Sequence, residues 1–353
     1  MFVKLGSIGD IVHTLPILNE VRRLRQDAQI DWVVDKRSAE ILRLNPMINN
    51  LLEFDSKNFH LLRPGKAHIT TKMQSRSWPQ LIRRLRADNY DLAIDFQGLL
   101  KSGAIAAISG AKEVFGFEKQ ALREPAARFF YSQKVSIPRI CHVIDKNFLL
   151  AQTALGEQLN TRPLEFPIFT DNSHKEEADF YLEKVKKPFA LLNPGGGWVT
   201  KLWRAENFGH LADELFEKAG LESIITAGPD EAELVQRACN AAKKRPYVAK
   251  LSLKGFYRLA KHAAVYVGGD TGPTHIAIAA KTPVVALFGP TEWFRNGSLN
   301  PSDICVERTD ITCRTDCYRR SCGKWICMDI NVETVLNAVI TRINAASGQV
   351  QIS

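Results

Sequence analysis

The chain has 353 residues, of which 45% are hydrophobic and 24% charged, so it is ordinary globular material long enough for two domains. It contains no run of about 18 apolar residues, and Lys4, Gly6 and Asp10 interrupt the start where a signal peptide needs an apolar stretch, so we expect a cytoplasmic protein. Lys and Arg outnumber Asp and Glu by 47 to 38, and the net charge of +9 favours an acidic partner such as a nucleic acid, a nucleotide or an anionic membrane surface.

The first half of the chain alternates strands and helices. The patterns predict strands at residues 2–5, 30–35, 51–54, 92–95 and 113–117, with helices such as 11–25 and 78–87 between them. This order is typical of a parallel sheet with helical crossovers. Because the first strand starts almost at Met1, we expect either a short strand or a true N-terminus upstream of this methionine.

The turn at residues 6–10, GSIGD, follows the first strand and opens a helix, and Asp35 ends the second strand, so a nicotinamide-dependent dehydrogenase is one hypothesis. The turn lacks the three-glycine spacing of a dinucleotide-binding loop and places a carboxylate where pyrophosphate would bind. Asp10 therefore argues against a dehydrogenase. Such a carboxylate is commonly a helix cap, and the alternative is a general base facing a cleft.

An irregular segment at 161–169 interrupts the alternation, which then restarts. We predict strands at 189–193, 223–227, 265–268 and 284–288, helices at 205–219, 230–243, 254–262 and 274–280, and a last helix at 332–345. The α/β pattern predicts two doubly wound domains, 1–165 and 166–353, with ligands beyond the carboxyl ends of the strands. The last helix is a candidate to pack back across the domain junction.

The sequence GGDTGPTH, residues 268–275, joins an apolar strand to a helix. Its glycines let the backbone approach a ligand, Thr271 suits an N-cap and Pro273 suits the first helical turn. Free N–H groups and the helix dipole at such a start favour a diphosphate. The alternative is an ordinary turn, because glycine-rich turns are common in α/β proteins.

Several blocks in consistent order carry a family resemblance. They are KLGSIGDIVHTLP (4–16), YDLAIDFQGLLKS (90–102), REP (123–125), NPGGGWVTKLW (193–203), AGPDE (227–231), GGDTGPTH (268–275) and FGPT (288–291). With these blocks the chain resembles glycosyltransferase family 9, the ADP-heptose:lipopolysaccharide heptosyltransferases, and is most similar to the type I enzymes. The resemblance implies a GT-B architecture, in which two Rossmann-like domains face each other across a cleft that holds the active site, and inversion at the anomeric carbon.

On the donor side, Lys201 matches the lysine that neutralises the departing diphosphate, and Glu231 matches an acid that binds the ribose. The alternatives are a solvated lysine and a first-turn dipole partner. The other candidate donor-binding residues are Gly195, Gly196, Gly197, Asp270, Thr271, Gly272 and His275. For the three consecutive glycines a mere turn is the alternative, and for the histidine a structural role.

On the acceptor side, Asp10 matches the general base that deprotonates the acceptor hydroxyl. His13, one helical turn on, either orients Asp10 or is simply a packing residue. The candidate acceptor-binding cations are Arg63, Lys66, Lys72, Arg76, Lys101 and Arg123. They suit an acidic Kdo sugar on a phosphorylated lipid, which would keep the enzyme at the inner-membrane surface. For the cations of 63–76 a solvated face is the alternative, and nothing there indicates a nucleic-acid module.

Seven cysteines, an odd number in a chain without an export signal, argue against a disulfide framework. Five lie in a Cys-rich segment at 305–327, namely Cys305, Cys313, Cys317, Cys322 and Cys327. The four close thiolates of Cys313, Cys317, Cys322 and Cys327 can hold structural zinc, but their spacing is not that of zinc ribbons. We favour reduced or loosely paired thiols over zinc, and zinc over an iron–sulfur cluster.

The resemblance therefore implies a metal-independent, inverting heptosyltransferase with ADP-heptose as donor and a Kdo-lipid A type acceptor. Two alternatives stay open: a family 9 transferase acting later in the core, and a non-catalytic sugar-nucleotide-binding protein. The combination of Asp10 with Lys201 favours the enzyme.

Overall fold

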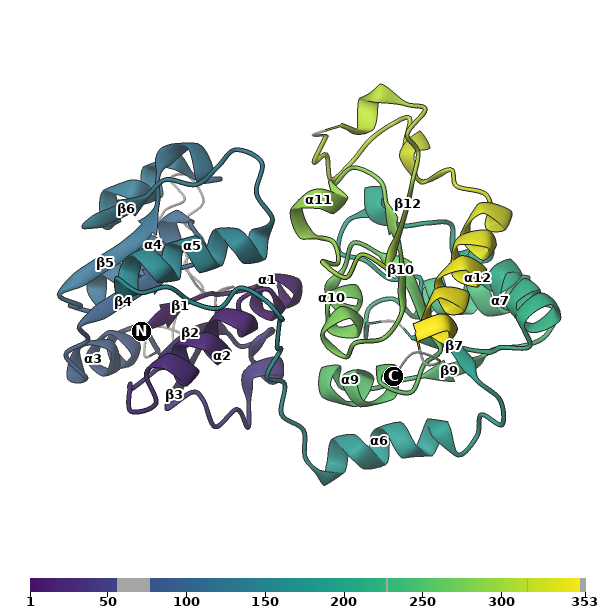
Figure 1. The fold of residues 1–353 in the computed structure, drawn as a ribbon, viewed down its shortest axis with the longest axis horizontal. Coiled ribbons are helices and arrows are strands. Elements are labelled where there is room, and N and C mark those ends of the chain that lie inside the picture. Colours follow the sequence, from purple (N-terminus) through teal and green to yellow (C-terminus); the bar gives the residue numbers. More distant parts are fainter. Residues whose placement is uncertain (56–76, 227, 316, 350–353) are drawn as a thin grey trace, which may run out of the picture. The chain divides into compact units, whose positions relative to one another are not determined.

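The chain divides into two compact units, residues 1–169 and 170–353. The computed structural model describes residues 1–55, 77–226, 228–315 and 317–349. Each unit is built on a six-stranded sheet whose paired strands are all parallel, with helices packed against it (Figure 1). The predicted architecture of two doubly wound α/β domains is confirmed.

The first unit contains five α-helices among its described residues. They are α1 (Ile8–Val12), α2 (Leu15–Leu24), α3 (Ser77–Ala87), α4 (Leu100–Ile108) and α5 (Val143–Leu155). The strands are β1 (Phe2–Val3), β2 (Asp31–Asp35), β3 (Asn50–Phe54), β4 (Leu92–Asp95), β5 (Glu113–Phe117) and β6 (Gln133–Val135). Their order in the sheet is β3-β2-β1-β4-β5-β6, so the winding reverses between β1 and β4.

The second unit repeats this strand order. Its strands are β7 (Phe189–Asn193), β8 (Glu222–Thr226), β9 (Tyr247–Ala249), β10 (Val265–Gly269), β11 (Val284–Phe288) and β12 (Ile304–Glu307). Its helices are α6 (Asn172–Leu182), α7 (Ala205–Ala219), α8 (Ala232–Ala241), α9 (Leu253–Ala260), α10 (Gly272–Ala279), α11 (Trp293–Asn296) and α12 (Val332–Gln349). The sheet order is β12-β11-β10-β7-β8-β9, with the reversal between β7 and β10.

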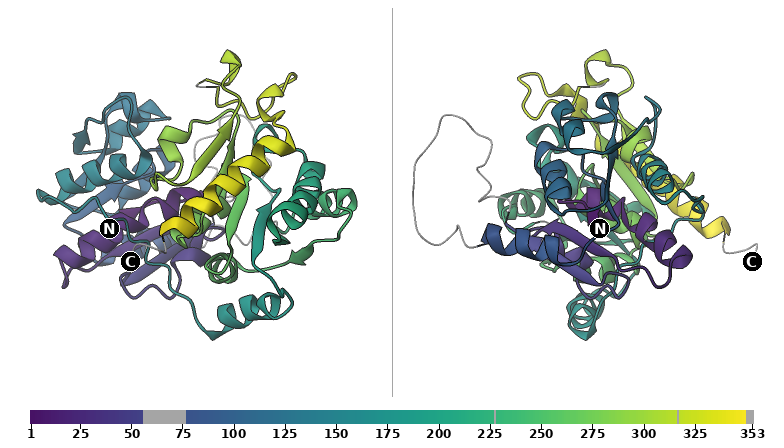
Figure 2. Two further views of the ribbon diagram at one scale, coloured as in Figure 1. Left: turned by 45° about the vertical axis from the view of Figure 1, so that its right-hand side comes forward. Right: turned by 90° about the vertical axis from the view of Figure 1, so that its left-hand side faces the viewer.

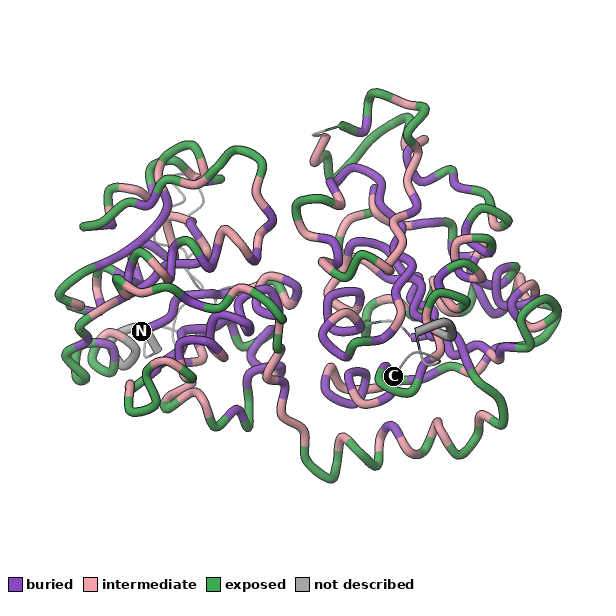
Figure 3. The backbone as a smooth tube through the Cα atoms, viewed as in Figure 1, coloured by how far each residue is buried: buried purple, intermediate pink, exposed green. Residues whose placement is uncertain are grey.

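The central strands of the second sheet are nearly all apolar because helices cover them. β7, β10 and β11 are buried at every position (Figure 3). Under the helices, the rings of Trp203 and Phe208 meet edge to face with their centroids 4.9 Å apart. This packed core holds the strand ends, and therefore the loops that follow them, in a defined register.

The long helix predicted at 11–25 is broken into α1 and α2. Pro16 lies in the first turn of α2, where it lacks an N–H donor and its ring would clash with the carbonyl of Val12 in a continuous helix. The strand predicted at 2–5 is shorter, since the amides of Leu5 and Gly6 bind the side chain of Gln97 at 3.1 and 3.2 Å. Strands β6, β9 and β12, which the patterns did not predict, lie at the sheet edges and are only three or four residues long, so they carry little alternation.

The last helix, α12, packs on α7 and on strands β10, β11 and β12 of its own unit. Figure 2 shows it, in yellow, running across these strands. Arg342 on α12 lies 2.9 Å from the carboxylate of Asp303, and both side chains are about 95% or more buried. Packing of this helix back to the first unit stays a prediction. Within the described ranges, no helix is long and apolar enough to cross a membrane.

Removing the charge of Arg342 should destabilise the second unit. Arg342→Met leaves the buried carboxylate of Asp303 without its cation, which should cost about 3 kcal/mol and lower the unfolding temperature by roughly 6–12 °C. Arg237→Met is the control, because it breaks an ion pair with Glu206 that is about half exposed. Calorimetry of the full chain measures both, and equal melting of the two variants would contradict the prediction.

Candidate functional site

The reversal point of the second sheet brings two loops together. β7 and β10 are paired in parallel, with Asn193 beside Gly268, so the loops after these strands start side by side. One loop contains the three consecutive glycines and a short 3₁₀ turn, Val199–Lys201, and the other leads through Asp270 into α10. Ligands of doubly wound sheets bind at such a point, beyond the carboxyl ends of the strands.

A buried carboxylate joins the two loops. The ammonium of Lys201 lies 2.5 Å from one oxygen of Asp270, and Asn296 donates to the other at 2.7 Å. The ring of His275 lies 3.3 Å from the same carboxylate. Burial alone would raise the pKa of Asp270, but His275 and Lys201 outweigh it and hold the pKa well below its usual range. The structure therefore brings together three residues that the sequence predicted.

Glu231 fastens the glycine loop to the loop that follows β8. Its carboxylate accepts hydrogen bonds from the amides of Gly196 at 2.7 Å and Gly228 at 2.6 Å. A Cβ on Gly195 would clash with this carboxylate, so a larger residue there would displace Glu231 from the two amides. A Cβ on Gly197 would meet no described atom within 4 Å, so the backbone at this exposed position is open to a ligand.

The start of α10 is arranged as predicted for an anion site, with one difference. Thr271 occupies the N-cap position and Pro273 lies in the first turn, but the hydroxyl of Thr271 makes no capping hydrogen bond. Thr274 donates its hydroxyl back to the carbonyl of Gly269 instead. The first-turn amides of α10, starting at Gly272, are therefore not occupied by the N-cap side chain, which suits the binding of an anion.

The first unit has a corresponding site at its own reversal point, between β1 and β4. The carboxylate of Asp10 accepts a hydrogen bond from the Ser7 amide at 2.8 Å and lies 3.7 Å from the ammonium of Lys4. The side chain of Asp10 is 36% exposed. Lys4 is buried and donates to the carbonyl of Phe96 at 2.8 Å. His13 is buried with its ring 6.0 Å from that of His142. Asp10 is thus a charge-compensated carboxylate within reach of solvent.

The turn after β4 is shaped by a second buried carboxylate, Asp95. It accepts hydrogen bonds from the hydroxyls of Tyr131 at 2.7 Å and Ser102 at 2.8 Å and from the amides of Gln97 and Gly98. Burial raises the pKa of Asp95 despite these hydrogen bonds. Since Gln97 holds the backbone of the β1 loop, Asp95 indirectly positions the segment that carries Asp10.

The predicted acceptor-binding cations fall into two groups. Arg63, Lys66, Lys72 and Arg76 lie outside the described residues. Lys101, in the first turn of α4, is half-buried, and burial lowers its pKa although Asp35 opposes the shift. Arg123 is exposed in the segment that follows β5. Both described cations follow carboxyl ends of strands, at the same edge of the sheet as Asp10.

Two residues of these sites were not predicted. Asn296, which binds Asp270, lies on α11 outside every motif, so no sequence signal pointed to it. Gln97 lies inside the block YDLAIDFQGLLKS, and an amide side chain directly after a strand end was the available signal.

The Cys-rich segment packs beside the donor-side loops. Arg314 is buried and donates to the carbonyls of Gly289 and Thr291 and to Glu307. All seven cysteines of the chain are free, and burial raises the pKa of Cys305 and Cys327. In the described part of the chain, no three or more His, Cys, Asp or Glu side chains are grouped as metal ligands.

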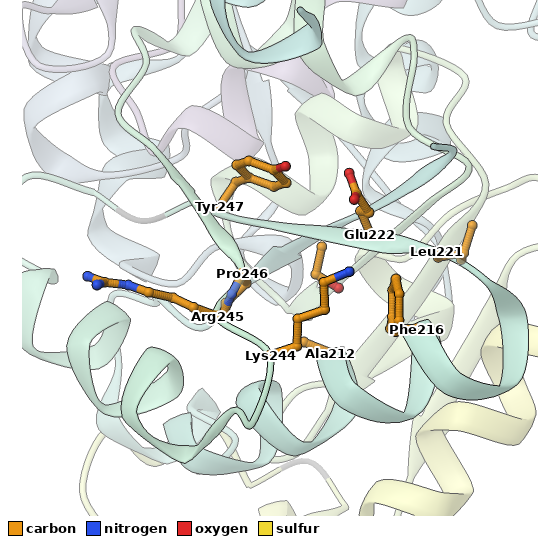
Figure 4. Close-up of a pocket in the computed structure, with 9 residues that line it drawn as sticks. Ala212, Phe216, Leu221, Glu222, Lys244, Arg245, Pro246 and Tyr247 are labelled. Carbon is orange, nitrogen blue, oxygen red and sulfur yellow. The ribbon is translucent and has the colours of Figure 1, made fainter. Parts of the chain in front are cut away.

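A separate, small pocket lies at the other end of the second sheet. Figure 4 shows its lining, which includes Phe216, Glu222, Lys244 and Tyr247. The pocket sits where β8 and β9 begin, whereas Lys201 and Asp270 follow strand ends. It is therefore distinct from the site at the reversal point.

Comparison with known proteins identifies the family. The model of glycosyltransferase family 9 (heptosyltransferase) matches residues 78–325. The chain belongs to this family. It is 28% identical to lipopolysaccharide heptosyltransferase 1 of Pseudomonas aeruginosa, over 91% of this chain and 86% of the relative, and 27% identical to that of Escherichia coli K12, over 83% and 88%. The protein is therefore a glycosyltransferase, and the resemblance found in its sequence is confirmed.

Solved structures share the fold over nearly the whole chain. The family 9 glycosyl transferase from Veillonella parvula superimposes with a TM-score of 0.78 at 22% identity, covering 98% of this chain and 96% of that one. The E. coli heptosyltransferase WaaC with ADP gives a TM-score of 0.73 at 23% identity, covering 97% and 98%. The fold of the two units is thus the GT-B fold of heptosyltransferases.

We expect the purified protein to carry far less than one metal ion per chain. A structural zinc site needs four ligands close together, and in the described part of the chain no three or more His, Cys, Asp or Glu side chains form such a group. Elemental analysis of protein purified without chelator measures the metal content, and thermal unfolding with and without EDTA measures its structural effect. Stoichiometric zinc, together with a lower unfolding temperature in EDTA, would contradict the prediction and make the Cys-rich segment a metal-stapled element.

Proposed function

We propose that the protein transfers heptose from ADP-heptose to a Kdo-lipid A type acceptor in lipopolysaccharide inner-core synthesis, with inversion at the anomeric carbon. The observation that carries the proposal is the pairing of Lys201 with buried Asp270 beside the start of α10. Relatives named lipopolysaccharide heptosyltransferase 1 support the sugar and the pathway, and the relative bound to ADP supports the nucleotide.

The second unit binds the donor in this proposal. The first-turn amides of α10 and the ammonium of Lys201 take the diphosphate, because both present positive charge at the strand ends. Glu231 has lone pairs beyond those used by the two glycine amides, so it can also accept a ribose hydroxyl. The open backbone at Gly197 allows close approach of the nucleotide sugar.

The first unit binds and activates the acceptor. The Asp10 carboxylate takes the proton of the attacking hydroxyl, and the oxygen bonds to the anomeric carbon on the face opposite the diphosphate. The bond from that carbon to the diphosphate oxygen breaks, and ADP leaves with the electron pair, which inverts the configuration. Lys101 and Arg123, with the cations of 63–76, bind the acidic sugar and phosphates of the acceptor.

The proposed chemistry assigns stabilisation of the leaving group to Lys201 and backbone amides, so we infer that no metal is required. A lipid-linked acceptor places the enzyme in the cytoplasm at the inner-membrane surface. The direct test is incubation with ADP-heptose and defined Kdo-lipid acceptors, with ADP release and product mass as readouts and NMR of the new linkage for its configuration. Release of ADP with no glycosylated acceptor would refute the assigned transfer.

Asp10→Asn should reduce kcat by about 10²- to 10⁴-fold, because the amide cannot accept the proton of the acceptor. ADP affinity should change little, since the nucleotide is assigned to the other unit. Asp91→Asn is the control, because Asp91 is an exposed carboxylate that pairs with Lys112. Steady-state kinetics and calorimetry separate the two effects, and near-normal turnover of Asp10→Asn would remove this residue from the mechanism.

Lys201→Ala should weaken ADP binding by about tenfold or more and also lower kcat, because a cation on the leaving group acts in the ground and transition states. Glu231→Ala should act mainly on ADP affinity, since it frees the glycine loop and removes a ribose acceptor. Lys218→Ala and Glu233→Ala, at exposed positions of the same unit, are the matched controls. ADP affinity equal to wild type in both site variants would show that these roles are misassigned.

A further inference from the structure

We propose that Arg320, in the Cys-rich segment, is a second cation for the donor diphosphate. The inference rests on the proposed function and adds a residue to the same site. Arg320 lies outside every block that carried the family resemblance, and it follows Lys201 by more than a hundred residues in the sequence. The Trp198 ring connects the two cations.

The ring of Trp198 is in contact with two cations. The Lys201 ammonium lies 4.4 Å from the centre of the Trp198 ring, and the Arg320 guanidinium lies 5.0 Å from it. Both distances are within the range in which a cation is attracted to an aromatic ring. The Arg320 guanidinium therefore contacts the same ring as the lysine that the donor diphosphate is proposed to contact.

The backbone around Arg320 is fastened to the donor-side loops. Thr200, the residue before Lys201, donates its hydroxyl to the carbonyl of Arg319 at 2.7 Å. The amide of Tyr318 donates to the carbonyl of Pro290 at 2.9 Å, in the loop after β11. These two hydrogen bonds hold the residues just before Arg320 against two loops at the strand ends. The backbone from which the Arg320 side chain extends is therefore anchored at the donor end of the sheet.

The charges at the site call for another cation. ADP leaves with about three negative charges at neutral pH. Lys201 also pairs with Asp270, which lies 2.5 Å away, so only part of its charge acts on the diphosphate, and a helix start contributes only about half a charge. Arg320 is exposed, and within the described ranges no carboxylate pairs with it. A guanidinium also suits phosphate geometry through its paired donors.

The test compares Arg320→Gln, Arg320→Lys and the control Arg319→Gln in the full-length protein. Arg319→Gln removes the same charge one residue away and keeps the backbone carbonyl that Thr200 binds. Calorimetry with ADP and with adenosine measures affinity with and without the phosphates, and steady-state kinetics give the KM of donor and acceptor.

We expect Arg320→Gln to weaken ADP binding about tenfold, Arg320→Lys to retain most of it, and adenosine affinity to stay unchanged. Arg319→Gln should bind ADP like the wild type. Equal ADP affinity in the Arg320→Gln and Arg319→Gln proteins overturns the inference, and so does a rise confined to the acceptor KM of Arg320→Gln. If Lys201→Ala also binds ADP like the wild type, or the wild type does not bind ADP, the proposed donor site itself fails.

Discussion

The donor end of the second unit depends on one buried carboxylate. Asp270 directly follows β10 and binds Lys201 from the loop after β7 and Asn296 from α11, so one side chain joins three segments. Removing such a charge from water is costly unless each oxygen has strong partners, and here a lysine, an amide and a histidine supply them. The same partners keep Asp270 ionised, and it in turn fixes the ammonium where the strand ends meet.

The first unit also has a buried carboxylate at the reversal point of its sheet, Asp95. Asp95 is the last residue of β4, beside the reversal of the first sheet, much as Asp270 directly follows β10. The partners of Asp95 are hydroxyls and backbone amides, so burial dominates and the pKa of Asp95 is raised. Its role is to shape the turn that carries Gln97, which holds the backbone before Asp10. At the reversal point of the second sheet, Asp270 forms an ion pair that joins two loops. At that of the first sheet, Asp95 orders the turn after β4 through hydrogen bonds.

The Cys-rich segment is attached to the donor end of the second sheet by hydrogen bonds that involve none of its cysteines. Arg314 fastens it to the loop after β11, and Thr200 fastens it to the loop after β7. Both loops belong to the donor end of the sheet. If Arg320 binds the donor as proposed, the segment supplies a guanidinium to this site, a role that does not require a metal.

From the sequence alone, the doubly wound architecture could be predicted, because buried parallel strands leave continuous apolar runs. The family and the candidates Lys201, Asp270 and His275 came from the resemblance of the sequence blocks. The structure brings these three side chains together, and their role in donor binding stays a prediction. Short edge strands such as β6 and β9 could not be predicted, because segments of three residues carry little periodicity. Only the tertiary structure showed that Asn296 binds Asp270 and that Arg320 lies at Trp198. These contacts join segments far apart in the chain, and strand order and packing, not local sequence, decide which of them meet.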